Sequence, residues 1–278
     1  MHHMIVNEQY RLNFDQETIV MGILNVTPDS FSDGGKFNTK SKAIEHAKFM
    51  VENGAKIIDI GGESTRPGHK PVSADEEIER VVPMIEQVTT HLDVPVSIDT
   101  FKAKTADHAV QAGATIINDV WGAKADPEIA DVSKTYNTPI ILMHNQDEPH
   151  YDDLIEDMKK SLAESIDIAI KRGVSKNKII LDPGVGFGKT QQHNLLAMRR
   201  LHELQTLGYP MLLGTSRKSV VGKALDLPVE ERLEGTIATV CSGIQQGVEI
   251  VRVHDVKKVS RAVKMMDAIL GKGDHLHG

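Results

Sequence analysis

The sequence predicts an α/β protein, a (β/α)8 TIM barrel in a single domain. Short β-branched runs alternate with longer amphipathic segments along all 278 residues. Most of the short runs lack polar alternation, so both faces of each strand are expected to be covered. Several runs end in a polar side chain, and in a parallel barrel such side chains meet at one rim. A doubly wound open sheet is the alternative, because alternation alone does not distinguish the two.

The apolar runs define the predicted strands. They cover residues 19–25, 56–60, 95–99, 115–118, 139–143, 178–182, 210–214 and 249–253. No linker or low-complexity tract divides the chain. We therefore predict one barrel over residues 19–272, preceded by an N-terminal extension at 1–18 and followed by a C-terminal tail at 273–278.

Between the strands, apolar residues repeat at helical spacing. The helix after the second strand is expected to begin at a capping box formed by Ser73 and Glu76. Pro228 suits the first turn of the helix that carries Leu233 and Ile237. Two further apolar stripes are Leu154, Met158, Leu162 and Ile166, and in the last helix Val259, Val263, Met266 and Leu270.

Composition excludes several classes of protein. The chain is 40% hydrophobic and has 32 Lys and Arg against 39 Asp and Glu, a net charge of −7 that argues against a nucleic-acid partner. A single cysteine excludes an internal disulfide and a thiolate-only zinc site. No apolar run approaches the ~20 residues of a membrane span, and no signal-peptide core is present. We expect a soluble, cytoplasmic protein without a membrane partner.

The segment at residues 181–189, LDPGVGFGK, is the strongest indication of a site. It places Asp182 at the end of an apolar run and continues in a loop too rich in glycine to be a helix, where the backbone can approach a ligand closely. The segment is not a phosphate loop, because that motif needs a glycine at the position of Pro183. It is not a dinucleotide fingerprint either, since the third glycine would fall on Lys189.

Asp99, Asn118 and Asp182 each end a predicted strand. Each alone could be a helix N-cap or a loop hydrogen-bond partner. Together they offer two carboxylates and an amide, which suit a flat heterocycle with a row of N–H donors and ring acceptors, such as an aminopyrimidine. Asp59 and Asp119 are alternative inward residues, and we assign Asp59 to structural support.

Four cationic side chains, at loop or strand ends, predict a negatively charged substrate, a phosphorylated one. They are Arg66, Lys218, Arg252 and His254. Most Lys and Arg residues lie in solvent, but Arg252 is flanked by two valines of a predicted buried strand. Residues 216–219 open a helix whose backbone N–H groups can face an anion. The amide oxygen of Asn25 could bind Mg²⁺ if substrate phosphates and water completed the octahedron.

The connections at residues 27–38, 61–73 and 144–153 are long. Loops of ten or more residues in a compact fold are often lids or binding loops. Glycines in the first two would allow them to close over a substrate.

With these motifs, the chain resembles the dihydropteroate synthases of folate biosynthesis from Met21 to about Gly271. The matching motifs are MGILNVTPDSFSDGG at 21–35, DIGGESTRPG at 59–68, SIDT at 97–100, IND at 117–119, LDPGVGFGK at 181–189, TSRKS at 215–219 and RVHD at 252–255. The resemblance implies condensation of 6-hydroxymethyl-7,8-dihydropterin diphosphate with 4-aminobenzoate, which yields 7,8-dihydropteroate and pyrophosphate. It also implies a TIM barrel, commonly a homodimer through the last helices, in which sulfonamides compete for the aminobenzoate pocket.

The resemblance also implies residue roles. The pterin would be bound by Asp99, Asn118, Asp182 and Lys218; the diphosphate by Arg66, Arg252 and His254, with Mg²⁺ bridging it to Asn25; and the aminobenzoate by Phe31, Thr65, Pro67, Phe187 and Ser219. Asp33 is a candidate to stabilise a pterin cation or to accept the amine proton, beside the cationic catalytic residues Arg66, Lys218, Arg252 and His254. We assign no definite role to Met143 and His144.

Two other functions are alternatives. A methyltetrahydrofolate methyltransferase module could share the pterin-binding Asp and Asn residues, but it would need a corrinoid partner and no aminobenzoate subsite. A pterin- or folate-binding protein without catalytic activity is the second. The presence of Asn25, Arg66, Lys218 and His254 argues against a degenerate homologue.

Overall fold

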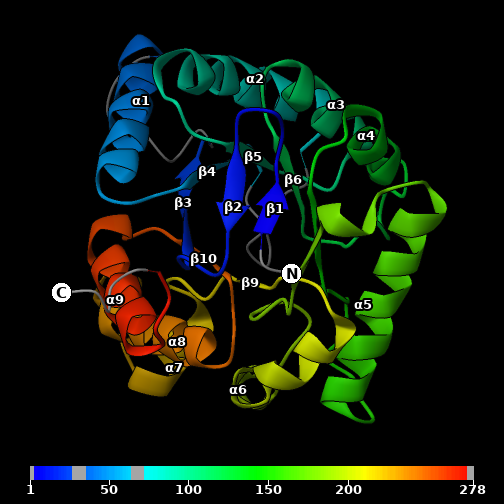
Figure 1. Ribbon diagram of the computed structural model, residues 1–278, viewed down its shortest axis with the longest axis vertical. Helices are drawn as coiled ribbons and strands as arrows, with labels where there is room; N and C mark the ends of the chain where they lie inside the picture. The colour runs from blue at the N-terminus through cyan, green and yellow to red at the C-terminus, as the bar shows by residue number, and fades with distance from the viewer. Residues whose placement is uncertain (1–2, 27–35, 64–71, 274–278) are drawn as a thin grey trace.

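The computed structural model describes residues 3–26, 36–63 and 72–273. Within them, one sheet of eight parallel strands has the order β8-β7-β6-β5-β4-β3-β10-β9. A bridge between Leu181 and Met211 joins β8 to β9, and the Leu181 amide donates to the Pro210 carbonyl at 2.9 Å. The sheet therefore closes into a barrel, and helices surround it (Figure 1). The predicted TIM barrel is confirmed, and the open-sheet alternative is wrong.

The strands agree with the predicted runs to within a residue or two. They are β3 (Ile19–Asn25), β4 (Ile57–Gly61), β5 (Val96–Asp99), β6 (Ile116–Asp119), β7 (Ile140–Met143), β8 (Ile179–Asp182), β9 (Leu212–Leu213) and β10 (Ile250–Val253). β9 is shorter than predicted. Pro210 has no N–H with which to extend the ladder, and Gly214 follows the strand.

The helices follow the predicted stripes. They are α1 (Lys36–Glu52), α2 (Ala74–His91), α3 (Ala103–Gln111), α4 (Ile129–Tyr136), α5 (Leu154–Lys171), α6 (Gln191–Arg199), α7 (Ser219–Leu225), α8 (Leu233–Gln245) and α9 (Val256–Ile269), with 3-10 turns η2 (Lys176–Lys178), η3 (Leu201–Leu207) and η4 (Val229–Glu231). Ser73 caps α2 by accepting the Glu76 N–H at 3.2 Å, while the Glu76 carboxylate pairs with Arg80. Pro228 does not lie in the first turn of α8; it precedes η4, a separate turn.

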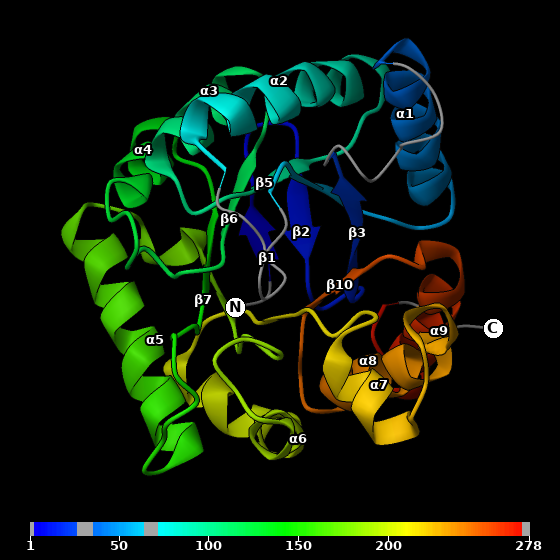
Figure 2. The ribbon, with the colours of Figure 1, turned by 180° about the vertical axis from the view of Figure 1, so that it is seen from behind.

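An N-terminal hairpin covers the amino end of the barrel, with β1 (His3–Ile5) antiparallel to β2 (Arg11–Asn13). The polar composition of this segment gave no indication of it. Four of its residues pack on the apolar inner layer of the barrel: Met4, Val6, Leu12 and Phe14, against Ile19, Met21, Ile57, Ile116, Ile141, Ile180, Leu212 and Ile250. The hairpin lies across the barrel in Figure 1 and behind the barrel strands in Figure 2. No helix among the described residues is long and apolar enough to cross a lipid bilayer.

Candidate active site

Strand alternation decides which polar side chains face the barrel interior. Ile57, Ile116, Ile180 and Ile250 belong to the inner apolar layer. Residues two positions further along a strand lie on the same side. The inward polar residues of the next layer are therefore Asp59, Asn118, Asp182 and Arg252, together with Asp99, which pairs with Asn118 in register.

The two alternative aspartates have different places. Asp59 faces inward in addition to the predicted residues, not instead of them. Asp119 follows an inward residue and faces outward, where its carboxylate accepts the Trp121 N–H at 2.8 Å and the Ala123 N–H at 2.5 Å. Asp119 therefore holds the turn after β6 and does not face the barrel interior.

Arg252 connects three strands across the interior. Its Nε donates to Asp59 at 2.6 Å, and its Nη2 donates to Asp99 at 2.7 Å. The Asn118 amide also donates to Asp59, at 3.3 Å. Burial raises the pKa of Asp99 to about 7, although Arg252 opposes the shift, and Asp59 adds to it. Burial lowers the pKa of Arg252, but the two carboxylates more than offset this and raise it.

Asp182 is held by the loop that follows β8. Its Oδ1 accepts the Gly184 N–H at 2.7 Å. Gly184 has φ 65°, and a Cβ there would lie 1.9 Å from the His144 carbonyl oxygen, so only glycine fits. Burial raises the pKa of Asp182, while Lys218 lowers it. The carboxylate therefore lies in a site where a donor-rich ligand would favour its ionised form.

Lys218 brings the end of β9 to the same site. It is the N-cap residue of α7, and its ammonium donates to the Val185 carbonyl. The ammonium also lies 4.5 Å from the centroid of the Phe187 ring, within cation–π distance. Burial lowers the pKa of Lys218 to about 8, against the raising effect of Asp182. The Lys218 ammonium therefore links the loop after β9 to the loop after β8.

The loops after β9 and β10 are also joined. The Ser216 hydroxyl accepts the His254 N–H at 3.1 Å and lies 2.9 Å from His254 Nδ1. Arg217 binds the Asp255 carboxylate at 2.9 and 2.7 Å. These bonds orient the imidazole at the end of β10, the strand that pairs with β9.

The structure thus brings Asp99, Asn118, Asp182, Phe187, Lys218 and Arg252 together, with His254 and Ser219 at the adjoining strand and helix ends. Asn25 ends β3 beside Gly61. Five predicted residues lie outside the described part of the chain: Phe31, Asp33, Thr65, Arg66 and Pro67. Among the described residues, no group of three or more His, Cys, Asp or Glu side chains could hold a metal ion. A metal here would need substrate oxygens beside the Asn25 amide.

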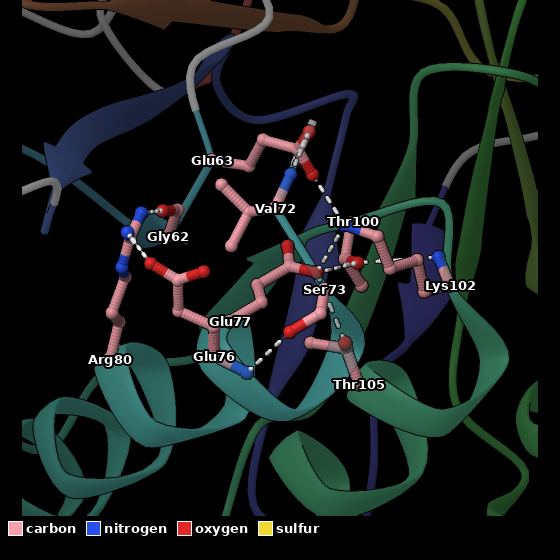
Figure 3. Close-up of polar contacts among 10 residues, drawn as sticks. All are labelled: Gly62, Glu63, Val72, Ser73, Glu76, Glu77, Arg80, Thr100, Lys102 and Thr105. Carbon is pink, nitrogen blue, oxygen red and sulfur yellow. Dashed lines mark hydrogen bonds and ion pairs between the residues drawn. The ribbon is translucent and has the colours of Figure 1, made fainter. Parts of the chain in front are cut away.

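A second buried polar network lies beside the site (Figure 3). Lys102 binds Glu77 at 2.9 Å and contacts Glu63, and Thr100 and Thr105 donate to Glu77 at 3.2 and 3.0 Å. Burial lowers the pKa of Lys102, but hydrogen bonds to Glu63 and Glu77 more than offset this and raise it. The sequence reasoning missed this network. The one feature of the sequence that could have predicted the network is that Glu77 lies four residues before Val81, on the apolar stripe of α2.

Glu63 also links the two ends of a long connection. Its Oε1 accepts the Val72 N–H at 3.2 Å, and Arg80 donates to the Gly62 carbonyl at 2.8 Å. The residues on both sides of segment 64–71 are thereby fixed to α2 and to Lys102 (Figure 3). The same network reaches strand β5, because Thr100 directly follows Asp99, the last residue of that strand.

Comparisons with known proteins agree with this geometry. The model of the pterin binding enzyme family matches residues 21–254. A dihydropteroate synthase of Bacillus subtilis is 60% identical over 96% of this chain and 94% of its own length. A crystal structure of the Clostridium difficile dihydropteroate synthase, in the presence of pteroic acid, is 56% identical with a TM-score of 0.89, over 91% of this chain and 97% of that one. The Xanthomonas albilineans enzyme with 4-aminobenzoic acid is 39% identical, with a TM-score of 0.92, over 97% and 98% of the two chains. The Yersinia pestis enzyme in a sulfonamide drug complex is 41% identical, with a TM-score of 0.90, over 96% and 99%.

Proposed function

Because the chain belongs to the pterin binding enzyme family, we propose that it is a transferase of folate biosynthesis, a dihydropteroate synthase. It condenses 6-hydroxymethyl-7,8-dihydropterin diphosphate with 4-aminobenzoate and forms 7,8-dihydropteroate and pyrophosphate. One observation carries this conclusion: buried carboxylates and an amide share the carboxyl end of the barrel with Lys218 and Arg252. The Bacillus subtilis relative, which is 60% identical, is named for the same activity.

The pterin binds between the inward carboxylates. Asp182 accepts hydrogen bonds from the 2-amino group and a ring N–H, and Asp99 and Asn118 face other polar edges. Lys218 donates to a ring acceptor. Each buried donor of a flat heterocycle needs a partner, and three strand ends supply fixed ones. A pterin that lacked the 2-amino group would deprive the buried Asp182 carboxylate of one of its hydrogen-bond donors.

The diphosphate leaves toward the cations. Arg252 and His254 lie at the end of β10, and Arg66 would join them from the connection after β4. Asn25 would hold a Mg²⁺ ion together with substrate oxygens, since a single amide suits a metal bound chiefly through its substrate. When bound, Mg²⁺ neutralises charge on the leaving group. The cations of this chain stabilise the same developing charge.

We propose a dissociative displacement. An aromatic amine is a poor nucleophile, so the C–O bond at the pterin methylene breaks first and leaves a cation delocalised into the dihydropterin. The amine then attacks the methylene carbon. Asp33 would stabilise the cation or accept the amine proton. Phe187 stacks on the benzene ring, and Ser219 at the start of α7 binds the carboxylate, with Phe31, Thr65 and Pro67 completing the subsite.

Sulfonamides are expected to compete with aminobenzoate at this subsite, as the drug complex of the Yersinia pestis relative supports. We also propose a cytoplasmic homodimer formed through the last helices. Val259 and Val263, two residues of the apolar stripe predicted for the last helix, are buried against the barrel. Met265 and Ile269 are the exposed apolar residues of α9, at 60% and 61% exposure, and support a partner on that helix.

Pyrophosphate release tests the proposal. The purified chain is incubated with dihydropterin diphosphate, 4-aminobenzoate and Mg²⁺, and then with each component omitted. A dihydropteroate synthase releases pyrophosphate and forms dihydropteroate only with both substrates. A binding protein would bind the pterin without release. A methyltransferase module would form no dihydropteroate, and that result would refute the proposal.

A further inference from the structure

Lys189 ties together the loop after β8, and the proposed reaction gives it no role. Its ammonium donates to the Gly184 carbonyl at 3.0 Å, to the Phe187 carbonyl at 3.1 Å and to His144 Nδ1 at 2.8 Å. Burial lowers the pKa of His144 to about 3, so its imidazole is neutral and can accept at Nδ1. Burial also lowers the pKa of Lys189, to about 7, against the raising effect of Asp182. One side chain therefore binds both ends of the turn at residues 184–187 and the end of β7.

This loop has no regular secondary structure to hold its shape. Gly184, Gly186 and Gly188 all have positive φ, at 65°, 90° and 52°. A Cβ on Gly188 would lie 2.4 Å from the Gln146 carbonyl oxygen, so the loop lies directly against residues 144–146. Its other bonds include the Phe187 N–H to the Gly184 carbonyl at 3.0 Å. Glycine-rich backbone of this kind keeps one conformation only while such bonds hold it.

The loop presents groups to both substrates, but unequally. Phe187 lies under the Lys218 ammonium, and the Val185 carbonyl accepts from that ammonium. A shift of the Phe187 backbone would move the ring on which aminobenzoate is proposed to stack. Asn118, in contrast, belongs to strand β6, and Asp182 belongs to strand β8 and takes only one hydrogen bond from the turn, that of the Gly184 N–H.

We propose that Lys189 is a positioning residue for the aminobenzoate subsite and that it acts through Phe187. This inference rests on the proposed function. It predicts a loss mainly for the second substrate, because Phe187 belongs to the loop itself, whereas Asp182 and Asn118 are residues of strands β8 and β6. If the lysine were needed only for folding, its substitution would weaken the binding of both substrates equally.

Steady-state kinetics and calorimetry of Lys189→Met test the inference. We expect the KM for 4-aminobenzoate to rise about 10- to 100-fold, as the loss of one charge-assisted hydrogen bond would produce. The Kd for dihydropterin diphosphate should stay within about threefold of that of the unmodified protein. In a Phe187→Ala background, the same substitution should add little, since the two residues act in one chain of contacts.

Lys178 offers a matched control at the opposite end of the barrel. It too donates to two carbonyls, those of Ile5 at 2.8 Å and Val6 at 3.0 Å. Lys178→Met should lower the Tm and leave both constants unchanged. An aminobenzoate KM within about twofold of the original, an equal loss of pterin affinity, or additive effects with Phe187→Ala would overturn the inference. Failure of both Lys189→Met and Lys189→Gln to fold would assign the residue to stability and overturn it as well. Failure of the proposed function would instead appear as no pyrophosphate release by the unmodified protein.

Discussion

The two ends of the barrel use the same strands for opposite purposes. At the amino end, an inner layer of apolar residues packs on the hairpin residues Leu12 and Phe14. Two positions further along the strands, the inner layer carries Asp59, Asp182 and Arg252 instead. The difference shows that strand alternation fixes the direction of a side chain, while position along the strand decides whether it serves packing or chemistry.

Burial of the charged layer destabilises the folded state, and burial of the apolar layer offsets this cost. Burying a carboxylate is unfavourable unless a cation and hydrogen bonds compensate. Arg252 serves two carboxylates at once, and the raised pKa of Asp99, about 7, reflects incomplete compensation by that one guanidinium. Changes at the carboxyl end should therefore alter activity more than stability, and changes at the amino end should do the reverse.

The largest effect is expected for Asp182→Ala. It removes the carboxylate proposed to bind the pterin donors, so kcat/KM should fall about 1000-fold or more, as for sites built to pair a buried donor. Asp119→Asn is the control, because Asp119 also ends a barrel strand, β6, but faces outward. Pyrophosphate release and the Tm are measured for both. Near-normal turnover of Asp182→Ala would remove that residue from the site.

Phe14→Ala tests the other end. The ring is buried at 3% exposure against the apolar layer. Its removal should lower the free energy of unfolding by about 3 to 4 kcal/mol, through lost burial and a cavity. Urea unfolding measures the loss, and KM for both substrates should not change in the folded fraction. A large rise in either KM would contradict the separation of the two ends.

The sequence predicted the barrel well because its strands are nearly uniform apolar runs, and strand ends are where the polar residues fall. It left open whether Asp59 and Asp119 face inward, since which side chains of a strand face the barrel interior depends on the register with the neighbouring strands. It missed the hairpin because a single buried apolar residue, Met4 or Leu12, lies between two exposed residues in strands of only three residues. Contacts between distant loops, such as Lys189 to His144, leave no local pattern at all.

Arg252→Lys sharpens the comparison within the charged layer. A lysine keeps the charge but cannot present the planar fork that reaches both Asp59 and Asp99. We expect the protein to fold and kcat to fall about 100-fold, because a charge-stabilising group is displaced from the leaving diphosphate. Single-turnover measurements of pyrophosphate formation test this. An unchanged rate of pyrophosphate formation would mean that Arg252 serves only to pair the carboxylates.

Lys102→Met tests whether the carboxyl end also holds purely structural charges. The substitution leaves Glu77, at 1% exposure, with only the two threonine hydroxyls as donors. The free energy of unfolding should fall by about 2 kcal/mol, because a buried carboxylate loses its cation. Lys104→Met, which breaks an exposed pair between α3 and Asp75 of α2, should lower the free energy of unfolding much less than Lys102→Met does. Adding Glu77→Gln to Lys102→Met should recover much of the loss; equal effects of the two lysine variants would contradict the assignment.

The smallest expected effect is the pH dependence of stability at Asp99. Burial raises its folded-state pKa to about 7 from an ordinary value of 3.8. Between these values the folded protein holds a proton that the unfolded chain has lost, so this group's contribution to stability falls as the pH rises from about 4 to 7. Asp99→Asn cannot lose a proton. Its Tm relative to the unmodified protein should therefore become more positive from pH 5 to pH 7. This range lies below the pKa of Lys218, which burial lowers to about 8 against the raising effect of Asp99, and Asp182 titrates in both proteins. Thermal unfolding at both pH values tests this prediction. A Tm difference that does not change, or that falls, would mean that Arg252 fully compensates the buried Asp99 carboxylate, so that burying it does not destabilise the fold.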